Sequence, residues 1–494
     1  MPGTLDQKLI DLCSDIKNLE REYQRYKARK QDFFQPRKVK IPVGVDGITS
    51  EFFEKELQRH LRTISLRLAG GKYHFSPFRE VLIPKDIHLN VDEAVQLGRV
   101  RVISVGCIKD VLAQQLLYQV LEPYAEEKFQ KLPGVSYAYR KGSSPQQAAR
   151  QVHRWAREGY HYVLDADIKS FFDEIPHDLL MEALEGFFGA DNPLVLKYLH
   201  RFISVDRVPW ESYAGQLRHF FSNKPDRHRR NRGIPQGGSI SGLLANVYMH
   251  DFDAWALSTQ NELGNLDRKY IRYADDFLFL LKEPGPMQKL QENIREKLAS
   301  KGLSIHSDPK KCKTIHLLSE PVEYVGFSIS PSGIAARRSN VQNFKKKVRA
   351  AIQKRQIAKD APDNDLEKLI QKVNLKLLGT EAQGGYLCTH CGKEPSPQNW
   401  MSFFAVLTRT EQLRSLDMWM KKTIMEHYYK CTGRRLKKTH PALKKLASLK
   451  ALHYRYRKEG KYAQYCKCSP ELARYKKKRN GQFPLAGMLY DNGY

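Results

Sequence analysis

The stretch YADDFLF, residues 273–279, decides the fold. It places Asp275 and Asp276 between two apolar runs, IRY before them and FLFLL after them. Apolar runs joined by a short polar tip predict a β-hairpin. Two carboxylates at such a tip repel each other beside a core, so their pKa values would rise unless a cation neutralised them. The sequence therefore predicts a cation site, whereas the simpler alternative is a solvated Asp-Asp turn.

A second pair of acids precedes the hairpin. The run HYVLDAD, residues 161–167, delivers Asp165 and Asp167 at the end of a β-like stretch. Hard, octahedral Mg²⁺ prefers a few carboxylates together with phosphate oxygens. Two such ions about 3.5–4 Å apart would activate an attacking 3′-hydroxyl group and stabilise a leaving pyrophosphate. We therefore expect two Mg²⁺ ions as the cofactor.

The charge of the chain points to a polyanionic partner. The 494 residues carry a net charge of +29. Residues 333–494 hold 35 Lys and Arg against 12 Asp and Glu, a net of +23, and the first 332 residues hold only +6. This asymmetry favours an enzyme body joined to a nucleic-acid-binding region. The alternative is a basic surface that serves solubility alone.

Length and composition set further limits. A chain of this length exceeds one core, which predicts two or three packed units, and a hydrophobic content of 41% excludes wholesale disorder. No run reaches the ~20 apolar residues of a membrane span, and the start of the chain does not resemble a secretory signal. Eight scattered cysteines do not form a disulfide framework. We expect a cytoplasmic (bacterial) protein without a membrane partner; both a monomer and a homo-oligomer stay open.

Hydrophobic spacing predicts the remaining elements. One polar helix is expected over 5–35, and a single strand over EYVGFSI, residues 323–329. After Val341 nearly all of the chain is expected to be helical. The other expected elements are two β-like runs between 78 and 105 and helices over 110–129, 145–158 and 239–257.

Several motifs then occur in one order. YADDFLF resembles the [F/Y]-x-D-D box of reverse transcriptases, and DADIKSFFDEIPHDLL (165–180) resembles their first catalytic-acid box. RGIPQGGSISGLLANVYMHDFD (232–253), GLSIHSDPKKCKTI (302–315) and EYVGF (323–327) resemble the boxes around them, as do GVDGIT (44–49), FREVLIPK (78–85) and VSYAYRKGSS (135–144) upstream. Between about 40 and 330, the chain is therefore identified as similar to group II intron-like bacterial reverse transcriptases. The absence of a recognisable endonuclease and an unusual C-terminal region favour a defence-associated (unknown-group or abortive-infection type) member.

The resemblance implies an α+β right-hand polymerase. Fingers and palm, with an antiparallel palm sheet flanked by helices, would precede an all-helical, basic thumb and C-terminal region. The expected divisions are an N-terminal helical extension (1–40), fingers (41–160), palm with fingers insertions (161–335), a helical thumb or maturase-like region (336–450) and a basic, Tyr-rich tail (451–494).

The resemblance also implies roles for individual residues. Asp167, Asp275 and Asp276 would be the metal ligands. Phe172 falls where the family places a ring under the sugar, which would exclude a 2′-hydroxyl group; a core Phe is the alternative. Gln236 would contact the incoming nucleotide, and Gly237 would let backbone approach the base pair.

Basic residues would handle the triphosphate. Lys85, Arg99 or Arg101, and Lys109 are candidates for phosphate contacts, of which we favour Lys85, Arg101 and Lys109. Lys310, Lys311 and Lys313 compete for the role of general acid toward pyrophosphate, and we favour Lys313, which precedes Thr314 as in the family. The chain departs from the family at Gly242, where intron-type enzymes commonly carry Pro.

The C-terminal region suggests two further sites. Cys388, Cys391, Cys466 and Cys468 could bind zinc, although we favour free structural cysteines over this unusual spacing. Interleaved tyrosines and cations in the last forty residues suit single-stranded RNA. Tyr490 or Tyr494 could supply a priming hydroxyl group, as in some defence-associated relatives.

The expected function is RNA-directed DNA synthesis. The predicted partners are an RNA template, a non-coding RNA in antiviral defence, together with nascent DNA and deoxynucleoside triphosphates. One alternative is a group II intron-encoded maturase that acts mainly by binding and splicing its intron RNA. Another is an RNA-copying RNA polymerase, against which Phe172 argues.

Overall fold

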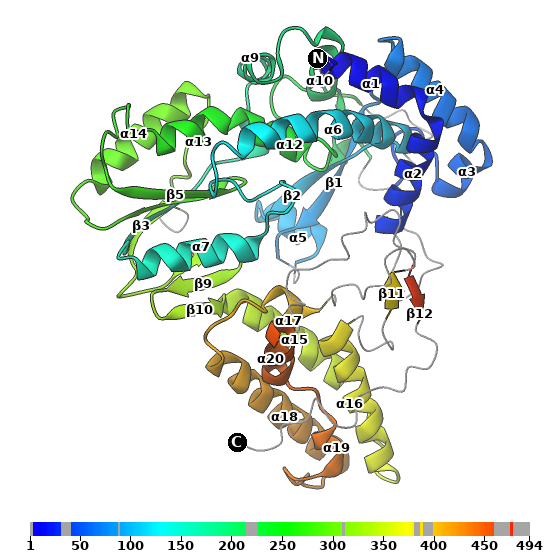
Figure 1. The fold of residues 1–494 in the computed structure, drawn as a ribbon. Helices are drawn as coiled ribbons and strands as arrows, with labels where there is room; N and C mark the ends of the chain where they lie inside the picture. Colours follow the sequence, from blue (N-terminus) through cyan, green and yellow to red (C-terminus); the bar gives the residue numbers. More distant parts are fainter. Residues whose placement is uncertain are drawn as a thin grey trace. The chain divides into compact units, whose positions relative to one another are not determined.

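The computed structural model describes residues 3–30, 41–86, 89–213, 226–308, 312–379, 386–388, 399–458 and 475–477. The chain forms two compact units, and element labels follow Figure 1. Unit 1 comprises Met1–Ser144 and Tyr160–Thr314, and unit 2 comprises Pro145–Gly159 and Ile315–Tyr494. None of the helices in the described ranges has both the length and the apolar composition needed to cross a membrane.

Unit 1 is built around a four-stranded sheet in the order β5-β6-β3-β7. The predicted hairpin is confirmed, because β5 and β6 pair antiparallel on either side of residues 274 and 275. The aliphatic and aromatic residues of β6 are buried from Phe277 to Leu281, as expected for a central strand. The strands are β3 (Tyr162–Asp167), β5 (Arg268–Tyr273), β6 (Asp276–Leu281) and β7 (Cys312–His316).

Helices cover one face of this sheet (Figure 1). The ring of Phe252 in α13 lies 5.8 Å from the ring of Phe277 in β6, centroid to centroid. The predicted helical segment 239–257 is confirmed, although it is divided at Met249 into two helices. The covering helices are α12 (Ser241–Tyr248), α13 (His250–Leu257) and α14 (Met287–Ser300).

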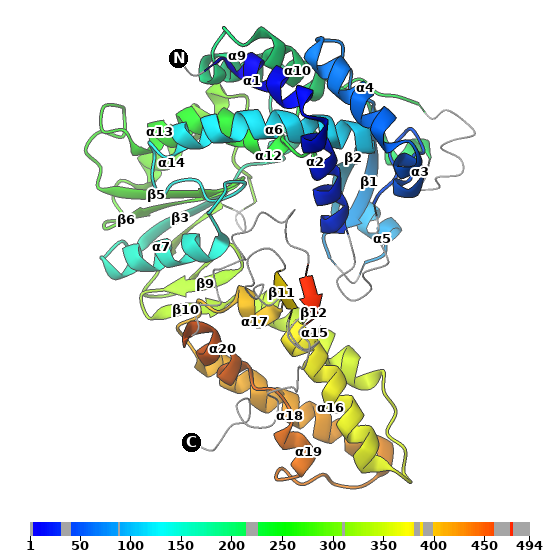
Figure 2. The ribbon, with the colours of Figure 1, turned by 45° about the vertical axis from the view of Figure 1, so that its right-hand side comes forward.

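A second sheet in unit 1 has the order β2-β1-β4. Its first two strands are the two predicted β-like runs, paired antiparallel, and they flank the short α5. The long α6 runs from α12 to the N-terminal helices (Figure 2). These elements are β1 (Phe78–Pro84), α5 (Val91–Gln96), β2 (Val100–Val105), α6 (Ile108–Phe129) and β4 (Arg207–Val208).

The single helix expected over 5–35 is wrong. The structure has α1 (Leu5–Ser14) and α2 (Ile16–Lys30), interrupted at Asp15. The Asp15 carboxylate accepts a hydrogen bond from the backbone N–H of Asn18 at 3.0 Å, which caps the start of α2. Both helices pack against α4 (Leu57–Ala69) and α6. The remaining helices of unit 1 are α3 (Ser50–Lys55), α8 (Phe171–Glu174), α9 (His177–Phe188) and α10 (Pro193–Ile203), with a 3₁₀ turn, η1 (Trp210–Ser212).

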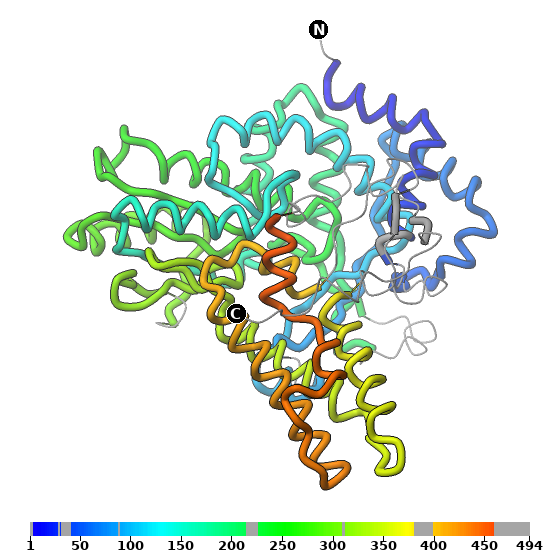
Figure 3. Tube along the Cα trace, turned by 60° about the horizontal axis from the view of Figure 1, so that its bottom comes forward, coloured from blue at the N-terminus to red at the C-terminus, as the bar shows by residue number. Residues whose placement is uncertain are grey.

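Unit 2 joins a small sheet to a group of helices, whose coils can be followed in the Cα trace (Figure 3). The single strand expected over EYVGFSI is wrong, because Val325 (φ 45°) and Gly326 (φ 91°) form a tight turn between two antiparallel strands. α7 (Pro145–Arg157) packs on this sheet, which is β8 (Val322–Tyr324), β9 (Phe327–Ser330) and β10 (Gly333–Ala336).

Most of the described residues after Val341 are helical, as expected. The exception is a short antiparallel pair, β11 (Tyr386–Cys388) with β12 (Tyr475–Lys477). The helices are α15 (Arg338–Gln353), α16 (Pro362–Leu378), α17 (Trp400–Phe403), α18 (Glu411–Thr432), α19 (Pro441–Lys444) and α20 (Leu449–Lys458).

Candidate active site

Strand pairing brings the predicted acids together at one end of the sheet. Asp167, the last residue of β3, is the register partner of Asp276, the first residue of β6. The Asp275 carbonyl accepts a hydrogen bond from the N–H of Ile168 at 3.0 Å. Asp167, Asp275 and Asp276 are all half-buried. Three acidic residues, two at strand ends and one in the hairpin turn, therefore lie at one end of the sheet, whereas Asp165 pairs with Leu278 farther along the sheet.

This donor set suits a hard cation only in part. Across the described ranges, no three His, Cys, Asp or Glu side chains are arranged to hold a metal ion. Carboxylate oxygens are nevertheless the ligands that Mg²⁺ prefers, and Mg²⁺ usually completes its shell with water and substrate phosphates. The residues thus fit an ion that arrives with its substrate better than one held in a protein cage.

A buried ion pair between Arg272 and Asp253 stabilises the hairpin tip. Arg272 is fully buried, and its Nε and Nη2 donate to the two carboxylate oxygens of Asp253 at 2.8 and 2.6 Å. Its Nη1 donates to the carbonyl of Ala274 at 3.0 Å. Ala274 has a φ of 61°, a left-handed conformation that is costly for a residue with a Cβ. The ion pair therefore holds the backbone that carries Asp275 in a strained turn.

The same region orders the segment 135–139. The N–H of Arg272 donates to the Val135 carbonyl at 2.8 Å, and the side-chain amide of Asn246 donates to the Ala138 carbonyl at 2.8 Å. The next residue, Tyr139, has a φ of 56° and projects a ring that is half exposed. These contacts set the position of Tyr139 beside the hairpin tip.

Tyr139 lies between a predicted ligand and a predicted sugar contact. Its ring meets the ring of Phe172 edge-on, with centroids 6.0 Å apart at 90°. Partial burial raises the pKa of the Tyr139 hydroxyl group, and the negative charge of Asp275 raises it further. Phe172 is half-buried and packs on Phe171 at 5.4 Å. Sequence reasoning quoted the segment of Tyr139 but missed the residue.

The segment RGIPQGG, residues 232–238, is hydrogen-bonded both to the backbone of Phe172 and to strand β2. The N–H of Ile234 donates to the carbonyl of Phe172 at 2.7 Å, and the carbonyl of Gln236 accepts from the N–H of Ser104 in β2 at 2.7 Å. Gly237 has a φ of 112°, and a Cβ on it would lie 3.0 Å from the Ser104 carbonyl. The backbone of this segment is therefore joined to Phe172 on one side and to β2 on the other, and glycine at 237 is required for its close approach to Ser104.

Cations gather around Asp173, next to Phe172. Lys85, Arg207 and Arg230 all lie within electrostatic range of its carboxylate. Arg230 is 8% exposed, and its buried Nε has no hydrogen-bond partner among the described residues. A buried, unsatisfied guanidinium N–H is costly and suits an anionic ligand. Sequence reasoning found Lys85 but missed Arg207 and Arg230; the basic run at 227–232 was the available signal.

Comparison with known proteins identifies the family. A model of the reverse transcriptase (RNA-dependent DNA polymerase) domain matches residues 83–329, half of the chain. The chain belongs to the reverse transcriptase family. This membership makes it an RNA-directed DNA polymerase by class, with an RNA template as partner, and the expected α+β polymerase fold agrees with the mixed, antiparallel architecture.

Relatives of this reverse transcriptase include intron-encoded proteins. Protein YkfC of Escherichia coli (strain K12) is 25% identical over 305 residues, which cover 56% of this chain and 72% of YkfC. The group II intron-encoded protein LtrA of Lactococcus lactis is 22% identical over 460 residues, covering 77% of this chain and 71% of LtrA. The predicted similarity to group II intron-type enzymes is thereby confirmed. Among solved structures, an apo telomerase from Candida tropicalis matches with a TM-score of 0.44 and 14% identity, over 88% of this chain and 76% of that chain.

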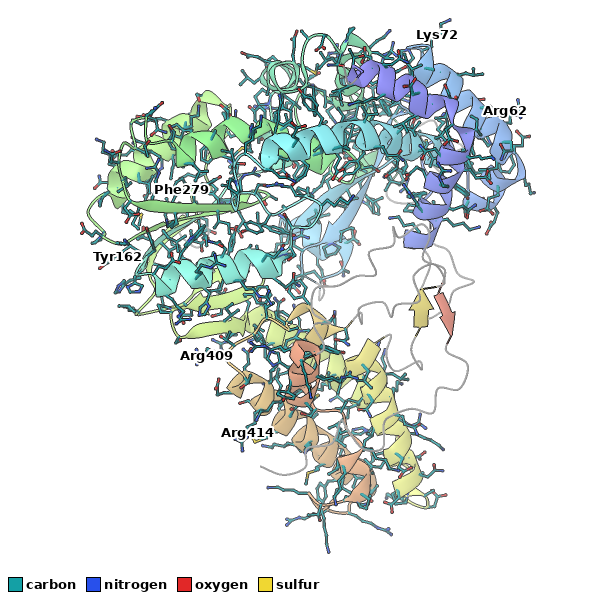
Figure 4. All side chains as sticks on the ribbon, in the orientation of Figure 1. Arg62, Lys72, Tyr162, Phe279, Arg409 and Arg414 are labelled. Atoms are coloured by element: carbon teal, nitrogen blue, oxygen red, sulfur yellow. The ribbon has the colours of Figure 1, made fainter. Side chains whose placement is uncertain are left out.

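The other predicted phosphate-handling residues of this reverse transcriptase lie at separate places. Arg101 is exposed on β2 and lies within electrostatic range of Tyr139. Lys109 is half-buried at the start of α6, within range of Asp110. Lys313 is half-buried in β7, the strand beside β3. Figure 4 labels Tyr162 and Phe279, which lie on the strands of the acids but away from the tip.

Some predicted sites lie outside the described residues. These are the priming candidates Tyr490 and Tyr494 and the competing lysines Lys310 and Lys311. Of the four candidate zinc ligands, Cys391, Cys466 and Cys468 also lie outside, and only the backbone of Cys388 is described, in β11.

Proposed function

We propose that this reverse transcriptase extends a 3′-hydroxyl group along an RNA template with Asp167, Asp275 and Asp276 as ligands of Mg²⁺. The register pair between Asp167 and Asp276 carries the proposal, since it brings these two acids together at one end of the sheet. Bound Mg²⁺ supplies Lewis-acid chemistry that favours the attacking alkoxide and the leaving pyrophosphate, and two ions are expected. The buried pair Arg272–Asp253 keeps the carboxylates in position before substrate arrives.

Neighbouring residues would select and hold the nucleotide. We propose that Phe172, braced edge-on by Tyr139, lies under the sugar and excludes a 2′-hydroxyl group. Gln236 and Gly237 would form the surface for the incoming base pair, because the backbone there is pinned to β2. These assignments rest on the assembly of three sequence-distant segments around one point.

Cations would bind the triphosphate. Lys85, Arg207 and Arg230 offer positive charge near Phe172, and the Nε of Arg230, which has no hydrogen-bond partner among the described residues, supports an anionic ligand there. Arg101 and Lys109 are proposed as further phosphate contacts. Lys313, in the strand next to β3, is proposed to protonate the pyrophosphate.

The biological template is proposed to be a partner non-coding RNA copied in antiviral defence, with fingers (41–160), palm (161–335), thumb (336–450) and tail (451–494) as the working divisions. Priming by Tyr490 or Tyr494 belongs to this proposal. The alternative is an intron-encoded maturase, which the similarity to LtrA favours.

One experiment separates these roles. Asp275→Ala together with Asp276→Ala should abolish antiviral protection if DNA synthesis carries it, whereas splicing assistance by a maturase would survive. Sequencing of the copurifying RNA and of the DNA made from it would identify the template. DNA unrelated to that RNA would refute copying of a bound partner, and the lack of any nucleotide adduct on tyrosine, judged by mass spectrometry, would refute protein priming.

A further inference from the structure

A basic cavity of about 530 Å³ lies within unit 2, and none of its residues belongs to the proposed polymerase site. It is formed by one face of α7, by β10, by the segment 405–408 and by the end of α20. Its lining residues are Arg150, His153, Arg154, Arg157, Glu158, Ile334, Ala405, Val406, Thr408 and Arg457.

The walls of this cavity carry four arginines against one acid. Arg150, Arg154 and Arg157 recur at helical spacing on α7, so their charges share one face and repel one another. Arg457 adds a fourth positive charge from α20. Arg154, Arg157 and Arg457 are exposed, and none forms an ion pair with a carboxylate in the part of the chain that the structure describes. An anion would relieve this repulsion.

The cavity lining also includes apolar side chains and the hydroxyl group of Thr408. Ile334 and Val406 are buried there. The Thr408 oxygen accepts a hydrogen bond from the N–H of Ile334 at 2.8 Å, which leaves its own hydrogen for a ligand acceptor. Half-buried His153 bonds to the Pro331 carbonyl, and burial lowers its pKa, so its ring adds polarity without a full charge at neutral pH. Cationic walls over an apolar floor suit a ligand with both phosphate and base or sugar surfaces.

We propose that this cavity binds the phosphates of a single-stranded nucleic acid. Arginine recognises phosphate oxygens through paired N–H groups, and lysine cannot reproduce that geometry. At 1.5 Å per residue, the face from Arg150 to Arg157 spans about 10 Å. This length is greater than that of one phosphate group, so it favours the successive phosphates of a strand. A free nucleotide offers the same chemistry over a shorter length. Binding here requires neither divalent ions nor DNA synthesis, so it stands apart from the proposed function.

The test measures binding of a fluorescein-labelled 20-nucleotide single-stranded RNA to the full chain, without divalent ions or nucleotides, over a series of NaCl concentrations. Arg154→Ala with Arg157→Ala should weaken binding at least tenfold. It should also reduce the slope of log Kd against log salt by about 1.4, because each lost phosphate contact on a single strand contributes about 0.7. The matched control is Arg414→Ala with Arg434→Ala, two exposed arginines of unit 2 outside the cavity; Figure 4 labels Arg414.

Four comparisons decide the outcome. Equal losses in the cavity and control variants would reduce the effect to net charge and overturn the proposal, as would an unchanged slope in the cavity variant. Arg154→Lys with Arg157→Lys should keep the slope and lose affinity, which supports bidentate arginine contacts. Binding of ADP to the same proteins tests whether a free nucleotide is the ligand. If the cavity variant loses ADP binding but keeps RNA binding, the single strand is the wrong ligand. The variant Asp275→Asn with Asp276→Asn should bind the RNA normally, so that failure of catalysis remains distinct from failure of this site.

Discussion

The ring of Tyr139 occupies the space that a side chain at residue 242 would need. A Cβ built on Gly242 would lie 2.4 Å from the Cγ of Tyr139, closer than any real contact. Residue 242 can therefore only be glycine while Tyr139 keeps this position. The small residue allows Tyr139 to lie between Phe172 and Asp275.

Gly242→Ala should therefore destabilise the protein by displacing Tyr139. Overpacking of this kind costs about 1–3 kcal/mol of unfolding free energy, measurable by urea denaturation. In the background of Tyr139→Gly, the same change should cost much less, because all the clashing atoms of Tyr139, its Cβ included, are absent. Equal costs in both backgrounds would show that the contact with Tyr139 is not the reason for glycine.

Asp275→Asn should abolish deoxynucleotide incorporation while the fold persists. Loss of a metal ligand removes several kcal/mol of transition-state stabilisation, so incorporation on a primed RNA template should fall by about 10²-fold or more. Asp165→Asn is the matched control, because Asp165 shares the strand of Asp167 but pairs with Leu278 away from the tip. Comparable losses in the two variants would place the metal ligands elsewhere on the sheet.

Phe172→Ala should relax the discrimination between deoxyribonucleotides and ribonucleotides. A pocket that excludes one small group discriminates by about 1–3 kcal/mol, so the relative use of ribonucleotides should rise about 10- to 200-fold. The ratio of kcat/KM for paired nucleotides measures this change. Phe52→Ala, at an exposed position of α3, is the control and should leave the ratio unaltered. An unaltered ratio in Phe172→Ala as well would make Phe172 a packing residue.

Asp110 should make stability depend on pH. Burial raises the pKa of Asp110 to about 6, even though Tyr73 donates a hydrogen bond to its carboxylate at 2.7 Å. The unfolded chain releases this proton near pH 4. Between about pH 4 and 6 the native state therefore holds more protons, and its unfolding free energy falls as pH rises, by up to about 3 kcal/mol.

The Asp110→Asn variant isolates this effect, because it cannot titrate. Urea denaturation at pH 4 and pH 7 should show the wild type losing stability relative to the variant as pH rises. A difference between the two proteins that stays constant over this range would mean that the pKa of Asp110 is the same in the folded and the unfolded chain.

Local patterns predicted the elements that carry the chemistry. The hairpin at 268–281 and the acid-ending strand at 162–167 follow from apolar runs a few residues long, and both are confirmed. Two local predictions failed for local reasons. The side chain of Asp15 caps a new helix within the expected single helix, and a left-handed Val325 turns the expected single strand back on itself.

The sequence by itself determined the polymerase family, the order of its motifs and the chemical types at the hairpin tip, because these depend on neighbouring residues. Only the tertiary structure decided which distant side chains meet them. Arg272 forms an ion pair with Asp253, Tyr139 lies against Gly242, and the buried Nε of Arg230 finds no hydrogen-bond partner within the described ranges. The arginines of α7 likewise face a cavity formed with α20. These contacts depend on how strands pair and helices pack between residues far apart in the sequence. The hydrophobic periodicity of a short segment does not encode that packing.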